Sequence, residues 1–222
     1  WRPERDRHVL IVVDCGRASS ALLGAPEHEE VDSIALGRAP RLDSSIETAL
    51  LLAALADRAG DKVHVLALDS QVRARVSGVR GAIETLARAF MDISPRLDVT
   101  DWSQAVGAIE QTVHHSAFVV VITKIPPAGM DTDFTDSLAR LCERHTVLVA
   151  SASDPDELRA RQGRDNAEEV FLAASAALAE RSDDAGASDV RMTGALTVRA
   201  SAGLLPARTA DRYIELKKSG RL

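Results

Sequence analysis

The feature that most constrains the fold is an unbroken apolar run, residues 9–13 (VLIVV), which ends at Asp14 and a short polar loop. A strand that helices cover on both faces is apolar throughout, whereas a half-exposed strand alternates. We therefore interpret this run as the first, central strand of a parallel sheet. Asp14 then lies at the carboxyl end of that strand, at the edge where open α/β sheets bind their ligands.

The remainder of the chain alternates between patterns typical of strands and of helices. Apolar runs predict further strands at 63–68, 117–122, 146–150 and 196–200, and strict alternation predicts an antiparallel edge strand at 72–76. Helical spacing predicts helices at 46–59, 83–90, 105–113, 134–142, 166–182 and 204–218, with a short one after Asp154. This order predicts a three-layer, doubly wound α/β fold with a mostly parallel sheet and one antiparallel edge strand.

Two helix boundaries rest on particular residues. Ser44 and Glu47 have the spacing of a capping box, which predicts that the first helix begins at Ile46. The polar segment 183–188 weakens the prediction of a continuous helix after residue 182.

The connection 24–40 is long, polar and rich in Gly and Pro, and such loops are usually functional or mobile.

Length and the first residues bear on domain organisation. A chain of 222 residues can form one domain with a proper core. We expect a single domain over 1–222, in which 154–222 is a C-terminal extension made of helices and a strand. The chain does not begin with Met, so we interpret residues 1–7 as a lead-in from a removed upstream region.

Charge and cysteine content exclude several classes. A formal net charge of −6 argues against a partner held by nucleic-acid phosphates, which requires a clustered basic face. No apolar run approaches the roughly 18 residues of a membrane span. Cys15 and Cys142 lie far apart, which favours two reduced thiols over a disulfide framework or a zinc site. We interpret Cys15 as a buried structural thiol.

The predicted strand ends bring Asp14, the Thr100-Asp101 loop and Thr123-Lys124 to one rim of the sheet. This constellation resembles the von Willebrand factor A domain, and more closely the bacterial von Willebrand A-like family known as domain of unknown function fifty-eight. The matching stretches are residues 1–5 (WRPER), 14–17 (DCGR), 40–43 (PRLD), 50–56 (LLLAALA), 58–63 (RAGDKV) and 211–217 (DRYIELK).

The resemblance implies a metal-ion-dependent adhesion site: an Asp-x-Ser-x-Ser loop, a threonine and a later aspartate. This chain has Gly16 and Ala18 where that loop has hydroxyls, and Lys124 where the later aspartate belongs. Because Mg²⁺ requires near-octahedral oxygen coordination, we expect a degenerate site with no metal cofactor. If Mg²⁺ or Mn²⁺ does bind, its ligands are Asp14, Ser19 and Thr100. A sharper hypothesis is that Lys124 pairs with Asp14 in place of the cation.

The resemblance also implies a function, namely a non-catalytic protein-interaction domain that partners a MoxR-type AAA+ ATPase. It implies the cytoplasmic side of a bacterial membrane, reached only through an N-terminal region that this chain lacks. The alternative is a small-molecule or phosphate-processing enzyme with Asp14 as acid, base or nucleophile. An actin-like phosphate loop at residues 14–19 is disfavoured, because a long loop and a helix follow instead of an antiparallel strand.

Overall fold

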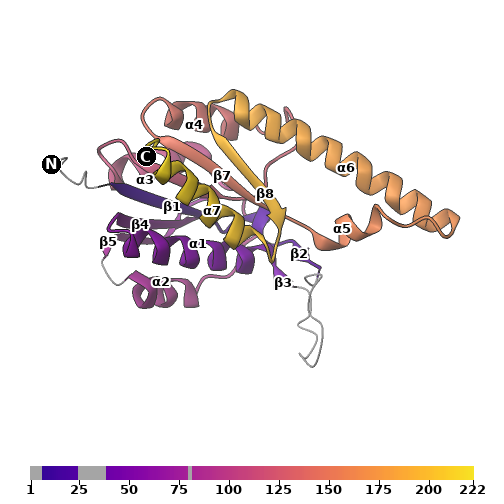
Figure 1. The fold of residues 1–222 in the computed structure, drawn as a ribbon, viewed down its shortest axis with the longest axis horizontal. Coiled ribbons are helices and arrows are strands. Elements are labelled where there is room, and N and C mark those ends of the chain that lie inside the picture. The colour runs from indigo at the N-terminus through magenta and orange to yellow at the C-terminus, as the bar shows by residue number, and fades with distance from the viewer. Residues whose placement is uncertain (1–6, 25–38, 80–81) are drawn as a thin grey trace.

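The computed structural model describes residues 7–24, 39–79 and 82–222 (Figure 1). Within them, six strands form one sheet in the order β5-β4-β1-β6-β7-β8, in which only β5 is antiparallel to its neighbour. The predicted fold class is therefore confirmed. The strands are β1 (His8–Asp14), β4 (Lys62–Leu68), β5 (Val72–Val79), β6 (Phe118–Ile122), β7 (Thr146–Ser153) and β8 (Leu196–Ser201).

Helices cover both faces of this sheet. The helices are α1 (Arg41–Arg58), α2 (Ala82–Met91), α3 (Trp102–Thr112), α4 (Thr132–Cys142), α5 (Pro155–Ala160), α6 (Ala167–Met192) and α7 (Leu205–Lys218). One core lies between the sheet and α1, α2 and α7, and the other lies between the sheet and α3, α4 and α6. No helix in the described ranges is both long and apolar enough to span a bilayer.

Strand β1 explains why its apolar run is unbroken. Val9, Ile11 and Val13 belong to the first core, whereas Leu10 and Val12 belong to the second. Successive side chains of a strand point to opposite faces, so each face of a central strand needs its own apolar set. The prediction that this strand is central and buried on both sides is confirmed.

The parallel register determines which residues meet at the carboxyl end of the sheet. Asp14 pairs with Leu68 of β4, and Val13 pairs with Ile122 of β6. The residues after these strands, Asp69 and Thr123, therefore lie beside Asp14 at the same edge.

Helix α1 begins earlier than predicted. Its first residue is Arg41, whose backbone N–H donates to the Ala21 carbonyl just after the short loop that follows β1. The two-residue strands β2 (Leu22–Leu23) and β3 (Ala39–Pro40) pair immediately before it. The capping-box prediction was wrong because the Ser44 hydroxyl, already inside the helix, donates to the carbonyl of Ala202.

Helix α6 is continuous over 26 residues, so the prediction of a weakened segment at 183–188 was also wrong. Figure 1 shows its amino-terminal half extending past the sheet, alongside α5. Gly186 lets the helix approach the loop after β6, because a Cβ there would lie 2.1 Å from the Pro126 carbonyl oxygen. Most of the predicted loop 24–40, and residues 1–6, lie outside the described residues.

Candidate functional site

The Asp14 carboxylate is the centre of the rim at the carboxyl end of the sheet. It is 2% exposed, and three donors occupy its two oxygens. Thr100 Oγ1 at 2.6 Å and the Gly16 backbone N–H at 2.9 Å donate to Oδ1. Thr123 Oγ1 donates to Oδ2 at 2.6 Å. The structure thus brings Asp14, Gly16, Thr100 and Thr123 together at the rim where the sequence predicted them.

Gly16 is held closely by its neighbours. A Cβ at this position would lie 2.4 Å from Thr100 Oγ1 and 2.8 Å from the Asp98 carbonyl oxygen. The same Asp98 carbonyl accepts the backbone N–H of Arg17 at 2.8 Å, which fixes the loop against the segment before α3. The Thr100 hydroxyl therefore occupies the space that a serine side chain at position 16 would need. This packing explains why the chain has a glycine there, where the adhesion motif has a serine.

The other predicted residues of the loops do not reach Asp14. The Ser19 hydroxyl turns back and donates to the Gly16 carbonyl at 2.7 Å. Ala18 contributes only its backbone carbonyl, which accepts from Arg41. Asp101 caps α3 by accepting the Gln104 N–H at 2.8 Å. These residues shape the loops around the carboxylate without supplying ligands to its site.

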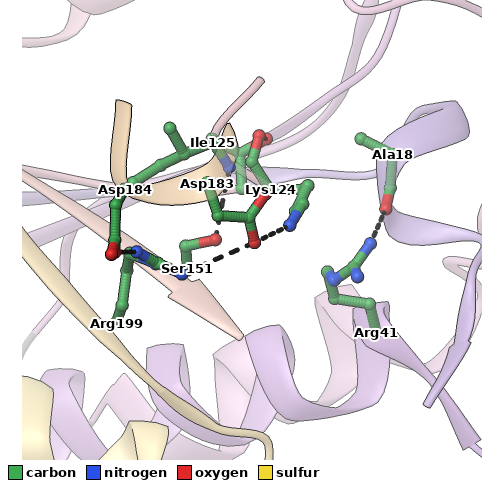
Figure 2. A network of polar contacts seen from close by, with 9 residues as sticks. Ala18, Arg41, Lys124, Ile125, Ser151, Asp183, Asp184 and Arg199 are labelled. Atoms are coloured by element: carbon green, nitrogen blue, oxygen red, sulfur yellow. Dashed lines mark hydrogen bonds and ion pairs between the residues drawn. The ribbon is translucent and has the colours of Figure 1, made fainter. Parts of the chain in front are cut away.

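Lys124 does not pair with Asp14, so that hypothesis was wrong. Its ammonium pairs with Asp183 of α6, and Arg199 of β8 contacts the same carboxylate at 3.5 Å (Figure 2). The physical reason is strand alternation: Thr123 points to Asp14, so the next side chain points away from it. Arg199 also bonds Asp184, and this cluster ties β6, β8 and α6 together.

A divalent cation does not fit the donors around Asp14. Both oxygens of the carboxylate already accept hydrogen bonds from three protein groups. In the described part of the chain, no three Asp, Glu, His or Cys side chains are grouped so as to hold a metal ion. Mg²⁺ and Mn²⁺ sites are built from several carboxylate or carbonyl oxygens, which this rim does not offer.

Arg41 is a site residue that the sequence analysis missed. It is 8% exposed at the start of α1, and its Nη1 donates to the Ala18 carbonyl at 2.6 Å (Figure 2). Burial lowers the pKa of this guanidinium, and the carboxylates of Glu157 and Asp154 oppose that shift. Its Nε is buried and has no hydrogen-bond partner among the described residues. A buried cation thus lies under the loop that follows β1.

A hollow of about 290 Å³ opens beside this network, between the ends of β7 and β8 and the helices α5 and α6. Its charged lining residues are Asp154, Glu157, Arg161, Glu180, Asp183, Asp184 and Arg199. Carboxylates outnumber guanidiniums in this lining, and Arg161 pairs with Glu180 across the two helices. Because Glu180, Asp183 and Asp184 are paired with Arg161, Lys124 and Arg199, the hollow favours a cationic group mainly beside Asp154 and Glu157. Sequence patterns could not reveal it, because its lining comes from four separate elements.

Cys15 follows Asp14 and is buried, as interpreted from the sequence. Burial, and then the nearby charges of Asp14 and Asp69, raise the pKa of its thiol to about 12. The thiolate is the nucleophilic form of cysteine. At neutral pH this thiol is therefore protonated and poorly suited to covalent chemistry.

Comparison with known proteins gives a family for the chain. A family model described as Protein of unknown function DUF58 matches residues 2–168, which is more than half of the sequence. No curated protein sequence matches the chain.

Solved structures match over nearly the whole chain at low identity. BatB from Bacteroides thetaiotaomicron is 13% identical with a TM-score of 0.59, over 97% of this chain and 100% of that one. A mutant of the PilB minor pilin from Streptococcus sanguinis is 12% identical with a TM-score of 0.58; the match covers 99% of this chain but 63% of the pilin. An aerotolerance-related membrane protein from Bacteroides fragilis is 10% identical with a TM-score of 0.51, over 92% and 99%.

At these identities the solved structures establish the shared fold alone. The family match is what assigns the sequence. The chain therefore belongs to the family described as Protein of unknown function DUF58, and it has the doubly wound α/β fold that the sequence predicts.

Proposed function

We propose that this domain is a non-catalytic protein-interaction module whose partner docks on the carboxyl-end rim of the sheet. The observation that carries the proposal is the environment of the Asp14 carboxylate: it is buried, and both of its oxygens accept hydrogen bonds from protein groups. These contacts support a degenerate adhesion site, whose loops are held by protein groups instead of a metal ion. Because the rim is already ordered, little conformational entropy is lost when a partner binds to it.

The hollow between α5 and α6 gives the rim its specificity. Its excess of carboxylates favours a lysine or arginine side chain from the partner, and the exposed Glu157 lies on its border. A partner with basic side chains also gains association rate from charge complementarity. The family resemblance points to a MoxR-type AAA+ ATPase as that partner, on the cytoplasmic side of a bacterial membrane.

The enzyme alternative is less well supported by the same geometry. A general acid, base or nucleophile has to come within hydrogen-bonding distance of its substrate. Asp14 is covered by the hydroxyls of Thr100 and Thr123. The neighbouring hollow carries an excess of negative charge, which disfavours a phosphate-bearing substrate.

The test is capture of the partner from cells that express the full-length protein. Charge reversal by Glu157→Lys places a cation on the border of the hollow. We expect this variant to lose the MoxR-type ATPase that the wild-type protein captures. Glu143→Lys is the matched control, because Glu143 is equally charged, is exposed and follows α4 at the opposite end of the sheet.

Two outcomes contradict the proposal. Equal capture of the ATPase by wild type and by Glu157→Lys would show that the rim is not the docking surface. Turnover of a small molecule by the purified wild-type protein, lost in Asp14→Asn, would support the enzyme alternative instead.

A further inference from the structure

The amino-end edge of the sheet carries a second candidate site, which lies away from the rim. A groove of about 280 Å³ runs between the last turns of α1 and α7. Its apolar side chains are Leu55, Ala59, Tyr213 and Ile214, and its basic border consists of Arg58, Lys217 and Lys218. An apolar groove bounded by cations is complementary to a ligand that is apolar at one end and anionic at the other.

One wall of the groove is rigidly built. The Lys217 ammonium donates to both carboxylate oxygens of Asp61 at 2.8 and 2.9 Å and to the Ala59 carbonyl at 3.1 Å. It also lies 5.6 Å from the centre of the Tyr213 ring. Tyr213 in turn donates its hydroxyl to Asp61. These contacts join α7 to the end of α1 and hold the groove in shape.

The other two cations are available to a ligand. Arg58 and Lys218 are exposed, and neither side chain is held by a hydrogen bond or an ion pair to any described residue. Both come from the carboxyl-terminal ends of helices, where basic residues offset the helix dipole. The dipole accounts for their charge. It does not account for the partly exposed apolar side chains of Leu55 and Ile214 between them.

The positive charge continues along the same edge. Arg7 and Arg221 border a neighbouring depression that shares Asp61 with the wall of the groove. Lys62 at the start of β4 and Arg144 just before β7 add two more exposed cations. Several cations thus gather along this edge, beside the carboxylates of Asp61 and Glu143, although the net charge of the chain is −6.

We propose that this edge docks on an anionic phospholipid surface, with headgroup phosphates on Arg58 and Lys218 and the apolar part of the lipid against the groove. Each basic side chain near an anionic membrane surface contributes about 1 kcal/mol, or about fivefold in affinity. Apolar contact adds a component that salt does not screen. The domain would then lie with its carboxyl-end rim facing away from the membrane.

The experiment is co-sedimentation with vesicles of equal parts phosphatidylglycerol and phosphatidylcholine, with pure phosphatidylcholine vesicles beside them. Wild-type protein should bind the anionic vesicles only, and salt should weaken that binding. Arg58→Glu/Lys218→Glu should lower the affinity at least about 25-fold, which corresponds to the two cations at fivefold each. Ile214→Ser should remove the part of the binding that resists salt.

The matched control is Arg17→Glu/Arg181→Glu, which makes the same change in net charge at exposed positions outside this edge. It should bind like wild type. The neutral pair Arg58→Gln/Lys218→Gln preserves the test if the charge reversal destabilises the helix ends. Equal loss in the control, or no binding of wild type to anionic vesicles at low salt, would overturn the proposal.

Other occupants give distinct outcomes, and each of them contradicts the lipid proposal. Binding of free fatty acid without vesicle binding would assign the groove to a soluble amphiphile. Salt-sensitive capture of an acidic protein without vesicle binding would assign it to a protein partner. Because Arg58→Glu/Lys218→Glu leaves the rim intact, it should still capture the ATPase, so the two proposals fail independently.

Discussion

The two ends of the sheet differ in how they handle charge. At the carboxyl end the charged groups of Asp14, Arg41 and Lys124 are buried or paired within the protein. At the amino end, Arg58 and Lys218 point into solvent beside an uncovered apolar groove. The polar groups at the carboxyl end are thus held by one another, and they form a surface of fixed shape. The amino end keeps its cations available and is suited to an anionic partner.

Helix direction explains why the charges separate. Helices α1 and α4 follow parallel strands, so they begin at the carboxyl end of the sheet and finish at the amino end. Each has an aspartate in its first turn and an arginine in its last, Asp43 and Arg58 in α1 and Asp133 and Arg140 in α4. Because these placements suit the helix dipole, an α/β domain of this topology becomes acidic at one end and basic at the other.

The largest effect should come from removing the Asp14 carboxylate, which tests whether an internal network organises the carboxyl end of the sheet. Asp14→Ala leaves the hydroxyls of Thr100 and Thr123 and the N–H of Gly16 without their acceptor. We expect the free energy of unfolding, measured with urea, to fall by about 3 kcal/mol. Asp14→Asn, which keeps one acceptor oxygen, should cost less than half of that. A loss below about 1 kcal/mol for the alanine variant would show that the carboxylate does not organise this end.

Restoration of a serine at position 16 tests whether the rim is a latent metal site. Gly16→Ser forces a Cβ to within 2.4 Å of Thr100 Oγ1, so we expect a loss of about 2 kcal/mol in urea denaturation. Mg²⁺ should not raise the thermal midpoint of this variant. Gly107→Ser, where a Cβ meets nothing within 4 Å, is the control for adding a serine. A Mg²⁺-dependent rise in Gly16→Ser would mean that the rim recovers metal binding by one substitution.

Lowering the pH should destabilise the folded protein through His64, at the amino end of the sheet. His64 is 6% exposed, and its Nε2 lies 2.9 Å from Nδ1 of His8. Burial, and then the charge of His8, lower the pKa of His64 from 6.5 to about 4. Since the unfolded chain binds the proton first, the stabilising contribution of neutral His64 is complete above pH 6.5 and is lost as the pH falls toward 4.

We therefore expect wild type to lose about 1–2 kcal/mol more than His64→Leu between pH 7 and pH 4. Guanidinium denaturation across this range measures the difference, and titratable groups that do not contact His64 cancel between the two proteins. Stability curves that stay parallel would show that His64 does not contribute to acid sensitivity.

The smallest effect should come from the ion pair that anchors α6. Lys124 and Asp183 are partly buried, with side-chain exposures of 27% and 15%. A double-mutant cycle with Lys124→Met and Asp183→Asn should give a coupling of about 0.5–1 kcal/mol that falls with added salt. A coupling of zero would imply that Arg199, which shares Asp183, neutralises it alone.

The fold could be predicted from sequence because the strands carry a strong local pattern. The VLIVV run of β1, the alternation that marks β5 and the Ala-rich spacing of α6 each depend on residues close together in the chain. Helix boundaries were less accurate, because the hydroxyl of Ser44 takes a partner from residue 202, far along the chain. The apparent capping box could not reveal that contact.

The site could be predicted only in part. Asp14, Gly16 and Thr100 follow a family pattern and were found. The partner of Lys124 was not, because Asp183 lies on a helix whose position depends on tertiary packing. Thr123 and Lys124 were both predicted at the rim, and strand alternation could have decided between them, since one of two successive residues after β6 has to face Asp14. Arg41 gave no local clue that a guanidinium would be buried.

Gly186 determines the axial position of α6 as well as its distance from the sheet. Only a residue without a Cβ can pass the Pro126 carbonyl oxygen, and Ala185 and Ala187 flank it in the sequence. If α6 slid by one residue along its axis, it would press a methyl group against that oxygen. Insertions or deletions between α5 and α6 must therefore be accommodated in the connecting loop. For the same reason, α6 cannot transmit motion by sliding along its own axis.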